Sequence, residues 1–164
     1  MLLQSSCGDD QPVPRFVIQG ETFVDVPGSL NAIETHSLIV REVDPLINSL
    51  LDINGMTAEQ VSEILPGTAL IRARSQNVDL SFINEISIRA ISRIDPARSI
   101  EMFYMDEVRF NEDFEMPLLP SIADVKSILL EGKFDLEVRL QLRRFSPASF
   151  RMELLYELDA FSNL

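Results

Sequence analysis

Two long stretches near the C-terminus alternate apolar and polar residues position by position, and this pattern limits the possible fold more than any other feature of the chain. Apolar residues occupy every second position from Phe134 to Leu142, and the alternation resumes at Phe150 and runs to Ala160, after a short segment that contains Pro147. A period of two places the apolar side chains on one face of a β-strand, whereas a helix would scatter them around its axis. We therefore predict two half-buried strands that pair as an antiparallel hairpin.

Shorter apolar runs and alternating segments predict further strands in the rest of the chain. They lie at residues 16–18, 22–26, 36–43, 69–73, 86–90 and 100–104. The first two fit either a hairpin around Gly20 or one bent strand. Together with the C-terminal pair they give seven or eight strands, and the turn spacing is typical of an antiparallel β-sandwich. We expect residues 15–164 to form this single, mainly β domain.

Two or three short helices are expected between the strands. The first covers residues 44–54, where Asp44 fits the N-cap position. The second covers residues 57–65, where Thr57 begins a capping-box pattern. The third covers residues 121–131 and follows a rigid loop that contains two prolines.

The only cysteine, Cys7, follows the segment Met-Leu-Leu-Gln-Ser-Ser and precedes Gly-Asp-Asp. This arrangement resembles the end of a bacterial lipoprotein signal, in which an apolar run stops at small residues before the cysteine that receives the lipid. Only three apolar residues and no basic residue precede Cys7, whereas a secretory signal carries a basic stretch and a run of about 7–15 apolar residues. The segment therefore fits either a signal truncated at its start or a plain tail.

These two interpretations place the protein differently. In the first, residues 1–14 are a truncated signal, a lipid-attachment site at Cys7 and a tether, and the chain is an outer-membrane lipoprotein of the cell envelope that faces the periplasm or the surface. In the second, residues 1–10 are a plain tail and the chain is cytoplasmic. Because no stretch approaches the roughly 18 consecutive apolar residues of a membrane span, the lipid on Cys7 is the membrane contact that we expect.

The charge balance and the scarcity of ligand residues exclude several functions. The chain has 14 Lys and Arg residues and 26 Asp and Glu residues, a net charge of −12, whereas nucleic-acid binding depends on clustered basic residues. There is no phosphate-binding loop, and one histidine, His36, with one cysteine cannot supply the usual ligands of zinc. We expect no nucleic-acid partner, no cofactor and no catalytic residue, with His36 in a structural or exposed role.

The densest group of carboxylates lies in one segment of the chain. It consists of Asp106, Glu107, Glu112, Asp113 and Glu115. Oxygen-rich loops bind Ca²⁺ in some proteins, but the EF-hand spacing and its glycine are missing here. We expect a solvated loop between strands, with a weak calcium site or a carboxylate-dependent hydrolase as alternatives that require the side chains to converge.

The order of the elements resembles one group of proteins. Residues 78–91 lead into the strand at 99–104, and a helical segment at 121–130 and the strand at 134–142 follow. This order and its apolar spacing are similar to those of uncharacterised Gram-negative surface lipoproteins with an immunoglobulin-like or LEA-like β-sandwich domain. The resemblance covers residues 35–161 and implies a non-enzymatic envelope protein.

These observations favour a lipid-anchored envelope domain that binds a protein partner or scaffolds an assembly, without catalysis. Edge strands or loops would form the recognition surface, and Phe145 and Phe161 are candidate exposed anchors. The alternative from another class is a carrier that holds a small apolar ligand or a lipid inside a barrel or a splayed sandwich. A filled interior favours the binding domain, and a continuous apolar cavity favours the carrier.

Overall fold

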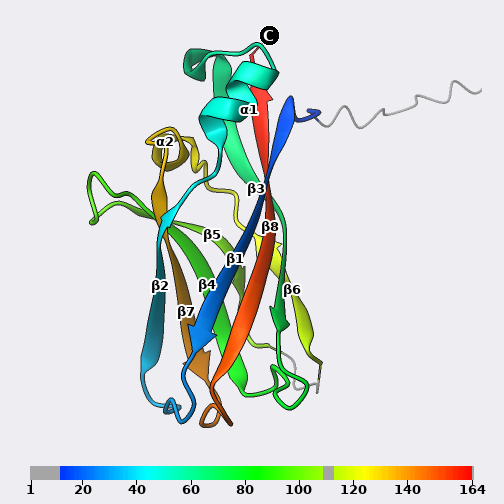
Figure 1. Ribbon diagram of the computed structural model, residues 1–164, viewed down its shortest axis with the longest axis vertical. Coiled ribbons are helices and arrows are strands. Elements are labelled where there is room, and N and C mark those ends of the chain that lie inside the picture. The colour runs from blue at the N-terminus through cyan, green and yellow to red at the C-terminus, as the bar shows by residue number, and fades with distance from the viewer. Residues whose placement is uncertain (1–11, 109–112, 164) are drawn as a thin grey trace, which may run out of the picture.

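The computed structural model describes residues 12–108 and 113–163, and over these residues the protein is mainly β (Figure 1). The strands are β1 (Phe16–Val26), β2 (Thr35–Val43), β3 (Val61–Ala73), β4 (Ile83–Ile91), β5 (Ser99–Met105), β6 (Glu115–Pro120), β7 (Phe134–Leu142) and β8 (Phe150–Ser162). The helical elements are α1 (Ile47–Ile53), the single-turn 3₁₀ helix η1 (Ala58–Gln60) and α2 (Lys126–Leu129). The prediction of a mainly β domain with short helices is confirmed.

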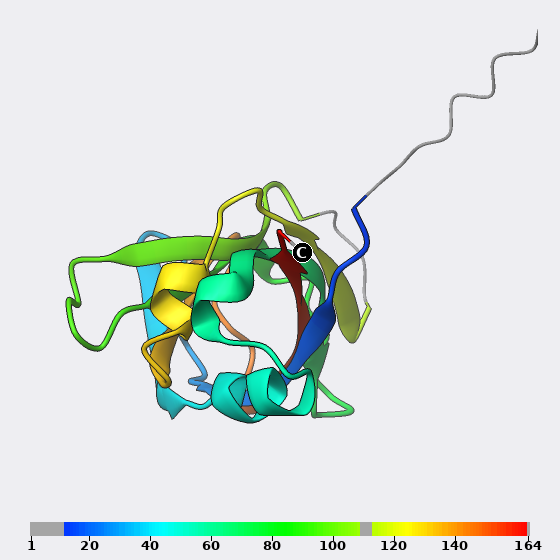
Figure 2. The same ribbon diagram turned by 90° about the horizontal axis from the view of Figure 1, so that it is seen from above.

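The eight strands belong to one antiparallel sheet with the order β1-β8-β3-β6-β5-β4-β7-β2. The sheet curls into a nearly closed barrel, which Figure 2 shows from one end. We call β1-β8-β3-β6 the first half and β5-β4-β7-β2 the second half. The halves are joined between β5 and β6 by only two residue pairs, Phe103 with Pro120 and Tyr104 with Leu119. A sandwich of two separate sheets, immunoglobulin-like or LEA-like, is therefore not confirmed.

The predicted hairpin of the two C-terminal strands is wrong, although both strands are present. β7 pairs with β2 and β4 in the second half, whereas β8 pairs with β1 and β3 in the first half. The connection between them therefore crosses from one half to the other. The Ser146 hydroxyl in this connection donates to the carbonyl oxygen of Pro27 (2.8 Å) and accepts from the N–H of Leu30 (2.9 Å). These bonds tie the crossing to the connection between β1 and β2.

Two other segments form strands where the sequence left alternatives or indicated a loop. Residues 16–26 are one strand, β1, rather than a hairpin around Gly20, and β1 pairs with β8 through all eleven of its residues. Residues 115–120 form β6 rather than a rigid loop. Proline lacks the N–H that a ladder needs, so it occurs where pairing is incomplete. Pro120 accordingly lies at the narrow joint between β5 and β6.

All three predicted helices are too long. α1 starts at Ile47, because Leu46 has a left-handed φ of 54° and its N–H donates to the Asp44 side chain (2.8 Å). The capping box at Thr57 forms, but it supports only η1, and β3 begins directly afterwards at Val61. α2 has four residues. Pairing of β3 with β8 overrides the local helical pattern after η1.

Side chains from the sheet and from both α-helices form one continuous apolar cluster inside the barrel. Its fully buried members include Ile18, Ile47, Ile71, Ile88, Phe103, Ile128, Leu136 and Leu154. Figure 1 shows α1 at the end of the barrel where β1 begins and β8 ends. No helix formed by residues 12–108 and 113–163 has the length and apolar character needed to cross a membrane.

Candidate functional site

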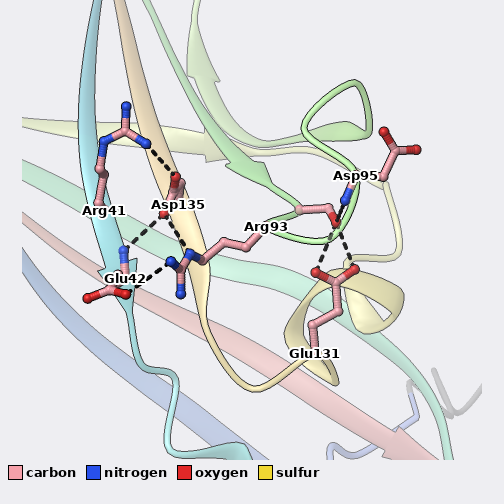
Figure 3. Close-up of polar contacts among 7 residues, drawn as sticks. Arg41, Glu42, Arg93, Asp95, Glu131 and Asp135 are labelled. Carbon is pink, nitrogen blue, oxygen red and sulfur yellow. Dashed lines mark hydrogen bonds and ion pairs between the residues drawn. The ribbon is translucent and has the colours of Figure 1, made fainter.

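A group of paired charges lies in the second half, where β2 and β4 end, β7 begins and the turn after α2 approaches (Figure 3). We call it the arginine–carboxylate cluster. It consists of Arg41, Glu42, Ser92, Arg93, Asp95, Arg98, Glu131 and Asp135. The fold brings its members together from four separate segments of the chain.

Asp135, the second residue of β7, fixes the end of β2. The N–H of Glu42 donates to its Oδ1 at 3.0 Å, and the guanidinium groups of Arg41 and Arg93 each lie 3.5 Å from one of its oxygens. Arg93 also pairs with the carboxylate of Glu42 at 3.0 Å. These contacts stabilise a bulge in β2, where Glu42 adopts a φ of 59° and the register with β7 shifts.

Ser92 organises the turn that leads from β4 to β5. Its hydroxyl lies 2.9 Å from both carboxylate oxygens of Glu131 and donates to one of them. The same hydroxyl accepts from the N–H of Asp95 (2.9 Å) and from the guanidinium of Arg98 (3.2 Å), and Arg98 also pairs with Glu131. Because Ser92 is buried and the Glu131 side chain is only 7% exposed, this group couples the β4–β5 turn to the turn after α2.

The cluster is suited to holding strand ends together rather than to transferring protons. A nucleophilic serine needs a base that can take its proton, but the carboxylate beside Ser92 is shared with Arg98. The histidine, His36, lies elsewhere on β2, with its Nε2 2.8 Å from the carbonyl oxygen of Asn31. Each buried side-chain nitrogen or oxygen that the structure describes has a hydrogen-bond partner. The described cluster thus offers ion pairs but no activated nucleophile.

Two pockets flank Arg93 on the outer surface. One, of 390 Å³, is lined by residues of β2, β4 and β7 that include Arg41 and Asp135. The other, of 480 Å³, lies beside the turn after α2 and includes Glu131. The Arg41 side chain is 76% exposed whereas that of Asp135 is 15% exposed. The cluster therefore presents guanidinium groups to solvent and keeps its central carboxylates covered.

The acidic segment does not form one site among the described residues. Asp106 and Glu107 follow β5, and Asp113 precedes β6. Glu115 pairs with an arginine of β3 instead of turning towards the others, and Glu112 lies outside the described residues. No group of three or more His, Cys, Asp or Glu side chains that could hold a metal occurs within residues 12–108 and 113–163. The calcium and hydrolase hypotheses for this segment stay predictions.

We expect Asp135→Asn to lower the free energy of unfolding by about 1–2 kcal/mol, because a neutral amide weakens the charge-assisted bonds at the bulge. Urea unfolding followed by circular dichroism measures the change. Arg41→Gln is the control, since its side chain is exposed and an exposed ion pair contributes little to stability. Equal losses in the two variants would contradict this prediction.

Neither the comparison with protein-family models nor the comparison with curated proteins gives a match for this chain. The arginine–carboxylate cluster is therefore identified as a candidate site from its geometry. Sequence reasoning missed it because Arg41 and Asp135 lie 94 positions apart. Each of them also has the pattern of an ordinary outward residue on an alternating strand, so no local signal distinguishes them.

Proposed function

We propose that this chain is a non-catalytic binding or scaffolding domain of the cell envelope, anchored to the outer membrane by a lipid on Cys7. The continuous buried core is the observation that supports binding over carriage. A carrier needs an internal apolar cavity of several hundred Å³, whereas here apolar side chains of both halves form one continuous buried cluster. The pockets of 390 and 480 Å³ beside Arg93 open on the outer surface.

The direction of β1 supports an anchor at one end of the barrel. β1 begins at the end that carries α1 (Figure 1). Cys7 precedes Phe16 by nine positions, so even a fully extended chain keeps the cysteine within about 32 Å of the start of β1. Cys7 itself lies outside the described residues. In this proposal the α1 end faces the membrane, and the opposite end faces away from it.

The opposite end carries two connections with exposed apolar side chains, residues 27–34 and 143–149. Ile33 is 91% exposed and Phe145 is 65% exposed, and the bonds of Ser146 hold the two connections together. Loops positioned by a rigid scaffold are frequent sites of partner contact. Phe145 has the exposure expected of an anchor, whereas Phe161 is half-buried. The two connections are therefore a candidate partner surface.

We also propose that this chain is related to the Gram-negative surface lipoproteins that carry an immunoglobulin-like or LEA-like sandwich. The narrow joint between the halves supports this comparison, since only two residue pairs connect β5 with β6. Without those pairs the barrel would become two packed four-stranded sheets.

The intact mass of the protein from the membrane fraction of its native host tests the anchor, with the natural upstream sequence retained. We expect a mature chain that begins at Cys7 and carries acyl chains. The matched variant Cys7→Ser should lack the acyl chains and leave the membrane fraction. An unmodified chain that retains Met1 in the soluble fraction would overturn the anchoring and turn attention to a cytoplasmic role.

A further inference from the structure

The sheet has two edge strands, and only one of them is blocked. β2 carries a bulge, a residue with a left-handed φ at Glu42, and the exposed cation of Arg41, which are devices that prevent a further strand from pairing. β1 has none of them. It pairs with β8 through eleven residues without a register shift, and it contains no proline and no basic residue. Among residues 12–108 and 113–163, no strand pairs with the other edge of β1.

The two edges approach each other at the β1–β2 connection and diverge towards the α1 end (Figure 1). We call the gap between the two edges the seam, and two inward-facing residues of β2 show that it is open to water. Leu38 and Val40 are only half-buried, whereas their partners on β7, Val138 and Leu136, are fully buried. A further strand beside β1 would cover the apolar side chains that the seam leaves partly exposed to solvent.

A groove of 430 Å³ crosses the outer face of β1, β8 and β3, and the charged side chains that line it are acidic. Its lining includes Gln19, Glu21, Thr68, Leu70, Leu155 and Glu157. Glu157 accepts hydrogen bonds from Gln19 (3.1 Å) and Thr68 (3.0 Å), and the carboxylate of Glu21 has no hydrogen-bond or ion-pair partner within the described part of the chain. Two carboxylates above two half-buried leucines fit the cationic head and the aliphatic stem of a lysine or arginine side chain.

We propose that the free edge of β1 receives an extended, basic segment of a partner protein as an additional strand. The partner backbone bonds to the edge of β1, and its inward side chains cover Leu38 and Val40. Its outward Lys or Arg side chains lie beside Glu21 of β1 and extend across β1 towards Glu157 of β8. The inference rests on the proposed binding function and names the chemistry of the partner.

Charge argues against a second copy of this chain as the occupant. The net charge is −12, so two copies repel each other. An antiparallel pair of β1 edges centred near Gly20 would also bring two Glu21 side chains close together, and like charges on neighbouring strands are destabilising. A basic segment meets neither obstacle.

The test uses the full chain and the synthetic peptide Thr-Val-Lys-Val-Lys-Val-Lys-Val-Thr, with a matched peptide in which Glu replaces each Lys. We expect saturable binding of the lysine peptide alone, and slower amide hydrogen exchange within residues 16–26 when it is bound. Glu21→Lys should weaken binding by about tenfold. Asp106→Lys makes the same charge change beyond β5 and should change binding by less than about twofold.

Binding without protection of β1, equal binding of both peptides, or equal weakening by Glu21→Lys and Asp106→Lys would overturn the inference. Sedimentation of the free chain provides a further check. If the chain forms a dimer that Glu21→Lys dissociates, then the strand beside β1 comes from a second copy of this chain and not from a partner protein. This test does not depend on the lipid. A lipidated Cys7 without peptide binding would overturn only the edge site, and peptide binding without a lipid would overturn only the envelope anchor.

Discussion

Gly20→Ala should lower the free energy of unfolding by about 3 kcal/mol, at the upper end of what overpacking of a protein interior costs. Gly20 lies on the inward side of β1, opposite Tyr156 of β8, and a methyl group on its Cα would overlap the tyrosine ring. Gly20 does not have a positive φ, so a side chain at this position strains no backbone angle. The expected cost therefore comes from the overlap alone.

The ring of Tyr156 has little room to move away. Tyr156 is 4% exposed, its ring centroid lies 6.4 Å from that of Phe103, and its hydroxyl is hydrogen-bonded to Thr22. Burial raises the pKa of Tyr156 to about 12, against the lowering effect of the bond with Thr22. The phenol therefore stays neutral at physiological pH and remains packed inside the barrel.

Urea unfolding of the original chain, Gly20→Ala and the outward-facing control Gln19→Ala measures this effect. The control should unfold as the original chain does, because Gln19 points to solvent. Adding Tyr156→Leu to Gly20→Ala should recover part of the loss, since the smaller side chain frees the space that the methyl group needs. If Gly20→Ala unfolds at the original urea concentration, the ring moves more freely than its contacts indicate.

The strands could be predicted from the sequence because burying one face of a sheet imposes a period of two. β7 carries that period over all nine of its residues and β8 carries it from Phe150 to Ala160, and both lie close to where the sequence places them. Their neighbours could not be predicted in the same way. A short connection favours a hairpin, but here Ser146 is bound to the distant β1–β2 connection, and this bond is invisible in a local pattern.

The helix starting near Thr57 illustrates the same limit at short range. The capping box is a local signal, and it forms as the sequence predicts. The apolar positions that follow fit a helical face and a strand equally well over so few residues. Val61 and Ile64 are buried within β3, so the choice is made by long-range pairing with β8. The local pattern therefore predicts the helical turn η1 correctly, but it predicts a helix where β3 begins.

The candidate site was harder to predict than the fold, because its signal lies between segments. Arg93 pairs with Glu42 and Asp135, and each of these residues resembles an ordinary solvated charge when it is read in its own segment of the chain. The densest run of carboxylates drew attention to residues 106–115 instead, although Glu115 is engaged with β3. Local density of charge is a poor guide where pairing is made across the sheet.

Glu153→Gln should lower the free energy of unfolding by about 2 kcal/mol, the loss expected when hydrogen bonds to a buried charge are weakened. Glu153 lies on the outward side of β8, yet it is only 2% exposed. One of its oxygens accepts from Arg72 at 3.1 Å, and the other forms an ion pair with Arg74 at 3.0 Å. Glutamine keeps the shape of the side chain, but it has one acceptor oxygen, and its amide N–H groups face a guanidinium that can only donate.

Register explains why this carboxylate is covered on a face that is otherwise exposed. Glu153 lies opposite Phe23 of β1 on one side and opposite Arg72 of β3 on the other, and Arg72 in turn lies opposite Glu115 of β6. One row of directly paired residues thus crosses the first half. The hydrogen bond with Glu115, and then the charges of Glu115 and Glu153, raise the pKa of Arg72.

Asp25→Asn is the matched control, because Asp25 pairs with Arg151 on the same face but both side chains are largely exposed. Urea unfolding should show no measurable loss for Asp25→Asn. Raising the salt concentration to about 0.5 M should leave the loss in Glu153→Gln unchanged, since covered pairs are screened much less than exposed ones. If the two variants lose stability equally, or if salt abolishes the loss in Glu153→Gln, then Glu153 is as solvated as its neighbours on the strand. The row of paired residues that contains Glu153 would then contribute to the solubility of the protein rather than to the rigidity of the first half beside the proposed binding edge of β1.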